Sequence, residues 1–505
     1  MERKNVWNEF TEKQLKELEE VCAGYIDFIS EAKTERECVT RIVNDMEEAG
    51  YRELSTLIGG KKQLKPGDKV YAVNMNKAIF MAHIGKKPLS EGLNILGAHI
   101  DSPRLDIKQN PLYEDGGLAY LDTHYYGGVK KYQWVTLPLA IHGVFVKKNG
   151  ETVELNVGED PDDPVFFVSD LLIHLAQEQM EKKASKVIEG EALDIIIGSE
   201  PIRLGKAEKK KADEDEEKKE AKDAVKKGVL KLLKELYGVE EEDFLSAELE
   251  VVPAGRAREA GFDRSMVLGY GQDDRVCAYT SYQAMLKLAA EKEATQEQPA
   301  ARRRGRPRKT DAAAAAQDFI PERTAVCLLV DKEEIGSVGA TGMQSRFFEN
   351  TVAELLELCG EGGDLNRRRC LASCNMLSSD VSSAFDPTYA ASFDKKNVAY
   401  LGRGMVFNKY TGARGKSGSN DANAEYLAKL RNIFDLDEVH FQTAELGKVD
   451  LGGGGTIAYI TALYGMNVID SGVAVLNMHA PWECTSKADI YETMRGYLSF
   501  LKRMD

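Results

Sequence analysis

His99 and Asp101 lie two residues apart in the segment Gly-Ala-His-Ile-Asp-Ser-Pro-Arg, which spans residues 97–104. The preceding residues 94–96 predict a buried strand, so both side chains would lie just past a strand end, where α/β proteins bind ligands. An imidazole can bind a metal ion through one nitrogen while a carboxylate holds the other nitrogen. Because His-x-Asp is also typical of a hydrogen-bonded loop, the metal hypothesis depends on further residues of the same kind.

Four later positions carry similar chemistry, each just beyond an apolar run or at a turn. They are Asp273 with Asp274, Glu333 with Glu334, Asp380, and His479. In a mostly parallel sheet such ends share one edge, and two histidines with three carboxylates suit paired zinc, manganese or cobalt ions with one bridging carboxylate. Adjacent glutamates diverge at a strand end, so one can bind metal while the other acts as general base on the metal-bound water.

Each of these positions also has a plainer interpretation. Glu333 and Glu334 fit a solvent-facing turn, and Asp273 with Asp274 fits the N-terminal cap of a following helix. His479 fits a core or capping histidine equally well. Their occurrence together and in order favours the metal site.

The elements that would position these residues follow the pattern of an α/β protein. A capping-box pattern at Thr11 predicts one amphipathic helix, and the segment that begins at Thr34 predicts a second, which ends at Gly50. Apolar runs predict further strands over 69–74, 78–83, 325–330, 371–377 and 473–478, and a helix over 422–434.

The chain of 505 residues is long enough for two or three domains. Short β-like runs predict an inserted, mainly β domain over 107–250, which divides an α/β domain into residues 1–106 and 251–505. Two excursions, 205–227 and 291–318, are too charged or too biased in composition to bury a face. We expect both to be solvated or disordered.

Composition narrows the class of protein. With 67 basic and 82 acidic residues the net charge is −15, which argues against a nucleic-acid or anionic-membrane surface. The sequence shows neither a long apolar run nor a secretory signal pattern, so we expect no membrane span and a cytoplasmic location. The eight cysteines are scattered without a Cys-x-x-Cys pair, which favours reduced thiols.

The second excursion contains a basic segment that begins at Arg302 and ends at Lys309. Its Arg-Gly-Arg-Pro core resembles an AT-hook, which lies in the minor groove of A·T-rich DNA. A DNA-associated scaffold is therefore an alternative function. A solvated surface loop is the favoured interpretation, because the rest of the chain is acidic and contains no second hook.

Five segments, taken in order, resemble the M18 family of metalloaminopeptidases, which includes aspartyl aminopeptidase and vacuolar aminopeptidase I. They are Gly-Ala-His-Ile-Asp-Ser-Pro-Arg, Asp-Asp-Arg, Lys-Glu-Glu-Ile-Gly-Ser, Ser-Asp-Val-Ser-x-Ala-Phe-Asp-Pro and Asn-Met-His. The resemblance covers nearly the whole chain except the two excursions. It implies a three-layer α/β/α, phosphorylase/hydrolase-like catalytic domain interrupted by a β-rich dimerisation domain, and a tetrahedral dodecamer built from dimers.

The same resemblance assigns the metal ligands by position. It makes His99 and Asp380 the terminal ligands of one ion, and Glu334 and His479 those of the other. Asp273 would bridge the two ions.

Three further residues receive roles from the resemblance. Asp101 would orient the metal-binding histidine, and Glu333 would be the general base. His174 resembles a family histidine that reaches the active site of a neighbouring subunit, where it would stabilise the oxyanion. Its local sequence instead predicts a core residue of an amphipathic helix.

Substrate choice depends on weaker signals. Lys409 is a candidate for the basic residue that the aspartyl branch uses to bind acidic side chains, but the local spacing departs from the animal enzymes. Neutral first residues therefore stay an open alternative. The glycine run 452–455 lacks the register of a nucleotide loop, and we interpret Gly454 and Thr456 as substrate-binding residues, with Thr456 opening a helix.

Together the sequence predicts a zinc metalloaminopeptidase with two divalent ions per subunit, zinc, manganese or cobalt. It would remove acidic (Asp or Glu) or neutral first residues from peptides with a free N-terminus, through a metal-bridging water activated by Glu333. A metal-dependent deacylase of N-acyl amino acids is the alternative within hydrolases, because it can use a similar metal pair. It would need a substrate with a blocked amine, whereas the aminopeptidase needs a free one. An inactive family member is disfavoured by the full set of ligands and base.

Overall fold

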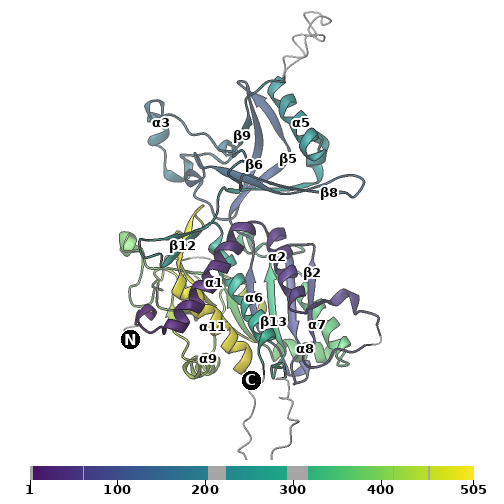
Figure 1. The fold of residues 1–505 in the computed structure, drawn as a ribbon. Helices are drawn as coiled ribbons and strands as arrows, with labels where there is room; N and C mark the ends of the chain where they lie inside the picture. The colour runs from purple at the N-terminus through teal and green to yellow at the C-terminus, as the bar shows by residue number, and fades with distance from the viewer. Residues whose placement is uncertain (1–3, 61, 203–222, 293–316, 413, 453–454) are drawn as a thin grey trace, which may run out of the picture.

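The computed structural model describes residues 4–60, 62–202, 223–292, 317–412, 414–452 and 455–505, which form a lower α/β body and an upper β-rich body (Figure 1). Among these residues, nine strands form the central sheet of the lower body. In spatial order they are β1 (Arg52–Glu53), β2 (Lys69–Asn74), β3 (Ala78–His83), β13 (Ala325–Val330), β4 (Asn94–His99), β14 (Asn375–Ser379), β18 (Asn467–Gly472), β16 (Met405–Asn408) and β17 (Phe441–Ala444).

The four central strands β13, β4, β14 and β18 are parallel to one another. Val330 at the end of β13 pairs with His99 at the end of β4. Ser378 of β14 pairs with Gly97, two residues before His99. This register brings the residues that follow β13, β4 and β14 to one edge of the sheet.

Helices cover both faces of the central sheet. One face packs against α1 (Glu12–Glu31), α2 (Glu35–Glu48), α6 (Gln272–Ala290), α9 (Ala424–Leu436) and α11 (Lys487–Arg503). The other packs against α7 (Phe347–Leu358), α8 (Asp364–Ala372) and α10 (Ala458–Ala462). The predicted three-layer α/β/α architecture is confirmed.

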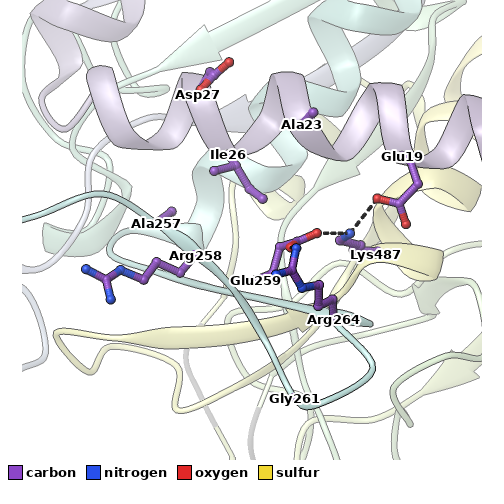
Figure 2. A pocket seen from close by; sticks show the side chains of 10 residues that line it. All are labelled: Glu19, Ala23, Ile26, Asp27, Ala257, Arg258, Glu259, Gly261, Arg264 and Lys487. Carbon is purple, nitrogen blue, oxygen red and sulfur yellow. Dashed lines mark hydrogen bonds and ion pairs between the residues drawn. The ribbon is translucent and has the colours of Figure 1, made fainter.

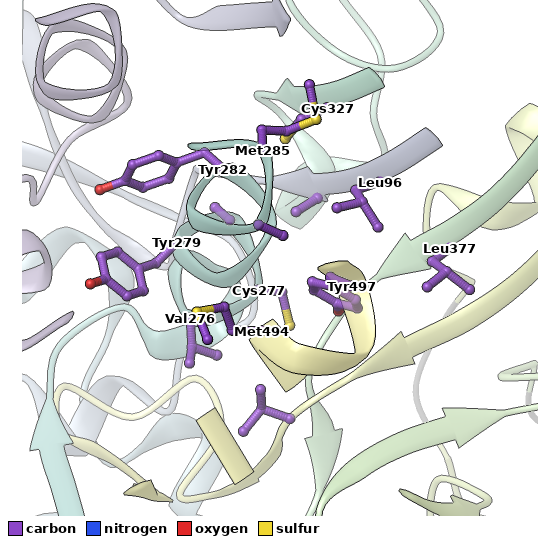
Figure 3. Close-up of a cluster of buried hydrophobic side chains, with 14 of the residues drawn as sticks. Leu96, Val276, Cys277, Tyr279, Tyr282, Met285, Cys327, Leu377, Met494 and Tyr497 are labelled. Atoms are coloured by element: carbon purple, nitrogen blue, oxygen red, sulfur yellow. The ribbon is translucent and has the colours of Figure 1, made fainter. Parts of the chain in front are cut away.

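The core between the sheet, α6 and α11 is continuous and apolar (Figure 3). Leu96 and Leu377 extend from β4 and β14 toward Met285 of α6 and Tyr497 of α11, all of them buried. Each such side chain contributes about 1.5–3 kcal/mol when fully buried. This packing fixes the strands whose ends carry the candidate site.

The predicted capping box at Thr11 is present, and the helix that begins after Thr34 has one as well. The Thr11 hydroxyl accepts from the backbone N–H of Gln14, and the Gln14 side chain accepts from the Thr11 backbone. Thr34 and Glu37 make the same exchange at the start of α2. These contacts satisfy backbone donors that the first turn of a helix leaves unpaired.

Two of the predicted strands are placed differently by the structure. The run 371–377 contains the end of α8, and β14 begins only at Asn375. The run 473–478 contains β19 (Ala474–Leu476), which belongs to a different sheet, whereas the central strand is β18. Short apolar runs do not distinguish a buried helix end from a strand, or one sheet from another.

The upper body is built on an antiparallel sheet, which has six strands in the part of the chain that the structure describes. They are β8 (Thr152–Val157), β7 (Leu139–Val146), β10 (Ala247–Pro253), β5 (Arg104–Asp115), β6 (Leu118–Tyr126) and β9 (Ile195–Gly198). Helix α5 (Ala224–Tyr237) packs against it, and the short α3 (Gln177–Met180) lies at its outer side (Figure 1). The predicted β-rich insertion is therefore present, while its exact limits, 107 and 250, stay a prediction.

A third sheet has five short strands among the described residues and lies in the lower body. They are β11 (Arg258–Ala260), β12 (Met266–Gly269), β20 (Glu483–Ser486), β19 and β15 (Ser382–Ser383). All eight cysteines are free thiols. Among the helices of the described ranges, none combines the length and apolar character that crossing a bilayer requires.

Both predicted excursions fall largely outside the described residues. Of the segment 205–227, the structure describes only residues 223–227, which open α5. Of the segment 291–318, it describes the two ends, where Lys292 and Asp318 form an isolated antiparallel β-bridge. The AT-hook-like segment from Arg302 to Lys309 lies outside the described residues, so its function stays a prediction.

Candidate metal centre

The structure brings all five predicted metal ligands together at one edge of the central sheet. His99 ends β4, and Glu334 lies in a 3-10 turn, Glu333–Ile335, directly beyond β13. Asp380 follows β14, and Asp273 lies in the first turn of α6. His479 follows β19 of the five-stranded sheet, so it reaches the site from outside the central sheet.

The ligand atoms form two groups that share Asp273. In one group the donor atoms of His99, Asp273 and Asp380 all lie within 4.8 Å of one another, and in the other those of Asp273, Glu334 and His479 do. Oδ1 of Asp273 lies 3.3 Å from Nε2 of His99, and Oδ2 lies 3.2 Å from Nε2 of His479. One carboxylate thus faces both imidazoles with separate oxygens.

The electrostatics of this cluster fit divalent cations. Burial and nearby carboxylates raise the pKa of Glu334 and Asp380 well above their usual values. Although burial opposes its charge, hydrogen bonds with His479 and His99 hold the pKa of Asp273 below its usual value. Oε1 of Glu334 is buried and has no hydrogen-bond partner among the residues that the structure describes. Imidazole nitrogens and carboxylate oxygens are the ligands that zinc, manganese and cobalt accept, so the residues present fit a metal pair.

Asp101 lies behind the ligands and is fully buried. Its Oδ1 lies 3.3 Å from Nδ1 of His99, which also contacts the Asp101 backbone carbonyl at 3.0 Å. Its two oxygens accept from the backbone N–H groups of Glu333 and Glu334, each at 3.1 Å. Asp101 therefore orients a predicted ligand and holds the turn that carries the predicted base.

Glu333 extends into the cluster from the same turn. Its Oε2 lies 3.9 Å from Nε2 of His99. Burial raises the pKa of Glu333 to about 7, although the imidazole of His99 acts in the opposite direction. A carboxylate with a pKa near neutrality suits proton transfer in both directions.

Two carboxylates that sequence analysis did not assign support the cluster. Glu483 accepts from the backbone N–H of His479 at 2.7 Å and from that of Asp273 at 3.0 Å. Oδ2 of Asp274 faces the backbone N–H of His99 at 3.4 Å. The Glu483–Asp273 and Asp274–His99 contacts join residues 210 and 175 positions apart, and neither Asp-Asp nor the segment 479–483 carries a local signal for them.

Three of the remaining predicted residues lie outside this cluster. His174 is exposed in a short turn of the upper body, Ile173–Leu175, so its interpretation as a helix core residue is wrong. Lys409 is exposed beyond β16, with its Nζ 3.9 Å from Asp421 Oδ1. Thr456 donates a hydrogen bond to Asp470 of β18 and accepts one from the N–H of Ala458, the first residue of α10. Gly454 lies outside the described residues.

A separate cavity of about 540 Å³ lies between α1 and the β11–β12 hairpin (Figure 2). Lys487 at its base pairs with Glu19 and Glu259 at 2.7 and 2.5 Å. None of the residues that line it is a predicted ligand, base or substrate contact. We therefore assign this cavity no part in the proposed metal chemistry.

Comparison of this chain with known protein families and solved structures shows which proteins it resembles. A family model described as aminopeptidase I zinc metalloprotease (M18) matches residues 28–302 and 311–501. The chain belongs to the M18 family. The unmatched residues 303–310 nearly coincide with the basic segment from Arg302 to Lys309. The M18 resemblance predicted from the sequence is confirmed, and the chain is a metalloaminopeptidase of this family.

Individual M18 relatives span the whole chain. A probable M18 family aminopeptidase 1 of Clostridium acetobutylicum is 58% identical over 500 residues, which cover 99% of this chain and 98% of the relative. The crystal structure of an M18 aminopeptidase from Thermotoga maritima has a TM-score of 0.86 and 41% identity, with both chains fully covered. An mApe1 dodecamer of S. cerevesiae, 17% identical, matches the fold with a TM-score of 0.69 over 95% of this chain and 96% of that one.

Proposed function

We propose that this M18 family member is a dinuclear aminopeptidase that removes the first residue of peptides with a free N-terminus. The observation that carries the proposal is the position of Asp273, whose two carboxylate oxygens face His99 and His479 at 3.3 and 3.2 Å. His99 and Asp380 would hold one ion, and Glu334 and His479 the other. Asp273 would bridge them, an arrangement that suits zinc, manganese or cobalt.

The residues around the two ions have distinct roles in this proposal. When bound, the two ions would supply Lewis-acid chemistry, which lowers the pKa of the attacking water and polarises the scissile carbonyl, and the α-amine would have to be free to approach them. Glu333 takes a proton from the water at its Oε2 and passes it to the nitrogen of the leaving amine. Asp101 keeps His99 oriented and holds the N–H groups of the turn that carries Glu333.

The first test is hydrolysis of chromogenic amides of Asp, Glu, Leu and Lys, each with a free and an acetylated amine. We expect cleavage of the free-amine substrates alone, because the proposal requires an unblocked α-amine. Chelation should abolish turnover, and zinc, manganese or cobalt should restore it. Initial rates with each metal provide the measurement.

Other outcomes of this assay would contradict the proposal. Cleavage of only the acetylated substrates would make the protein a deacylase of N-acyl amino acids. No turnover with any of the metals would make it an inactive member. The ranking of side chains decides between acidic and neutral first residues, and Lys409→Ala tests whether this exposed lysine contributes to an acidic preference.

We also propose that the chain forms a homo-dodecamer built from dimers, in which His174 acts in a neighbouring subunit. The apolar neighbours of His174 are exposed in the single chain, including Ile173 at 63% and Leu175 at 70%. An exposed apolar patch of this kind marks an interface. Figure 1 shows the adjoining α3 at the outer side of the upper body, apart from the lower body that carries the metal centre.

Complementation tests this role of His174. We expect His174→Ala to lower kcat by about 10²–10³-fold, the usual effect of losing one oxyanion donor. Mixed oligomers of His174→Ala and Glu333→Gln subunits should recover turnover. In them a Glu333→Gln subunit supplies its intact His174 to the active site of a His174→Ala subunit, which keeps Glu333. Light scattering gives the mass, and a monomer or dimer would overturn the dodecamer. Mixed oligomers without recovered turnover would overturn action between subunits.

A further inference from the structure

The end of β6 reaches from the upper body into the metal centre of the lower body. Three consecutive residues, Tyr126, Gly127 and Gly128, each approach a different residue of the centre. Tyr126 hydrogen-bonds Asp101, and the carbonyl of Gly128 contacts the ring of His479. A Cβ on Gly127 would lie 3.4 Å from the Glu334 side chain.

Tyr126 acts on the carboxylate that organises the centre. Its hydroxyl donates to Oδ2 of Asp101 at 2.9 Å, and both side chains are buried. The same oxygen accepts from the backbone N–H of Glu334 at 3.1 Å, while Oδ1 receives that of Glu333 and faces the ring of His99. Donors from three segments therefore fix one carboxylate, and a buried acceptor that loses a partner costs free energy.

The ring of Tyr126 is itself held from both bodies. The guanidinium of Arg104 lies 3.9 Å from the centre of the ring. Arg104 is buried and pairs with Glu35 of α2 at 2.7 Å and with Glu250 of β10 at 3.2 Å. A cation stacked on an aromatic face stabilises its position, so the hydroxyl is presented to Asp101 from a fixed direction.

Gly128 acts on the imidazole of His479. Its carbonyl oxygen lies 3.1 Å from Nδ1, which leaves Nε2 facing Asp273 at 3.2 Å and Glu334 at 3.7 Å. A Cβ on Gly128 would lie only 2.9 Å from Nδ1, so any larger residue would push the ring away. Glycine at this position is explained by the close approach.

We propose that residues 126–128 form a positioning clamp, in which the Tyr126 hydroxyl sets Asp101 and the Gly128 carbonyl sets the His479 ring. Tyr126 and Gly128 are positioning residues, because they act on the centre through Asp101 and His479. The inference rests on the proposed function, since it concerns the same metal pair. It also makes the upper body a part of the metal centre rather than a separate module.

The test compares Tyr126→Phe and Gly128→Ala with the wild-type full-length protein. Tyr126→Phe keeps the ring under Arg104 and removes only the hydroxyl, and the half-exposed neighbour Tyr125 provides the matched control Tyr125→Phe. Metal dissociation constants from competition with a chromophoric chelator and the visible absorption spectrum of the Co²⁺-loaded protein are measured beside kcat. Circular dichroism confirms that each variant is folded.

We expect Tyr126→Phe to weaken metal binding by about 10-fold, the lower end of the range for groups that hydrogen-bond metal ligands directly, because Tyr126 acts through Asp101. Gly128→Ala should also change the Co²⁺ spectrum, because it displaces a ligand ring, and Tyr125→Phe should match wild type in both readouts. Wild-type affinity and spectrum in both Tyr126→Phe and Gly128→Ala would overturn the clamp. Wild-type protein that binds metal without turnover would overturn the proposed function alone, and wild-type protein that binds no metal would overturn both.

Discussion

Replacing Glu333 with glutamine is expected to lower kcat by about 10²–10⁴-fold, the contribution of a general base. The amide is nearly isosteric but cannot take a proton from water. The predicted ligands keep their positions, because Asp101 holds the turn through the backbone N–H of residue 333, which the substitution retains. Metal content and KM should therefore stay close to those of the wild type. Steady-state kinetics and metal analysis on one preparation provide the measurement.

The control for this variant is Glu354→Gln, which changes an exposed glutamate on α7. It should leave kcat unchanged. If Glu333→Gln instead loses metal, Glu333 is a ligand and its assignment as base is wrong. If kcat stays within a few-fold of wild type, another group accepts the proton.

Several strands of the nine-stranded sheet were predictable from sequence, because each is a short, mainly apolar run with polar residues at or just beyond its end. The predicted ranges 69–74, 78–83 and 325–330 coincide with β2, β3 and β13. Parallel pairing of β13 with β4 places the polar residues that follow both strands at one edge of the sheet. For this reason His99 and the turn after β13 were expected to meet. This part of the site follows from local pattern and a general rule of topology.

The position of His479 could not be predicted in the same way. The chain leaves the central sheet at Gly472, where a Cβ would lie 2.0 Å from the carbonyl oxygen of Asp380. It then pairs as β19 with β20 of another sheet. The run 473–478 is as apolar as a central strand, so its composition contains no sign of this change of sheet.

Apart from Asp101, the groups that hold the ligands were missed, because their roles arise from contacts between distant segments. Glu483 accepts from the backbone N–H groups of His479 and of Asp273, and Asp273 lies 210 residues before Glu483 in the sequence. Tyr126 reaches Asp101 only because β5 and β6 return the chain to the metal centre. Neither residue stands in a motif that single-sequence reasoning can recognise.

Replacing Asp273 with asparagine is expected to reduce bound metal from two ions per subunit to one at most, with loss of detectable turnover. Asparagine offers one carbonyl oxygen and one NH₂ group. One imidazole would still face an oxygen, as His99 and His479 each do now, but the other would face a hydrogen-bond donor that cannot bind a cation. The negative charge between the two metal sites is also lost. Metal affinity should therefore fall by more than about 100-fold, the upper end of the range for losing a group that only hydrogen-bonds a ligand.

We expect this loss of metal to result from removing the bridging carboxylate of Asp273, and not merely from removing one negative charge from the protein. Asp435→Asn, which removes an exposed carboxylate on α9, is the matched control and should bind two ions with wild-type affinity. Metal analysis after dialysis and titration calorimetry give the stoichiometry. Two ions bound to Asp273→Asn with wild-type affinity would show that the sites do not share this carboxylate. His99 with Asp380 and His479 with Glu334 would then form two independent sites, and the dinuclear mechanism would have to be abandoned.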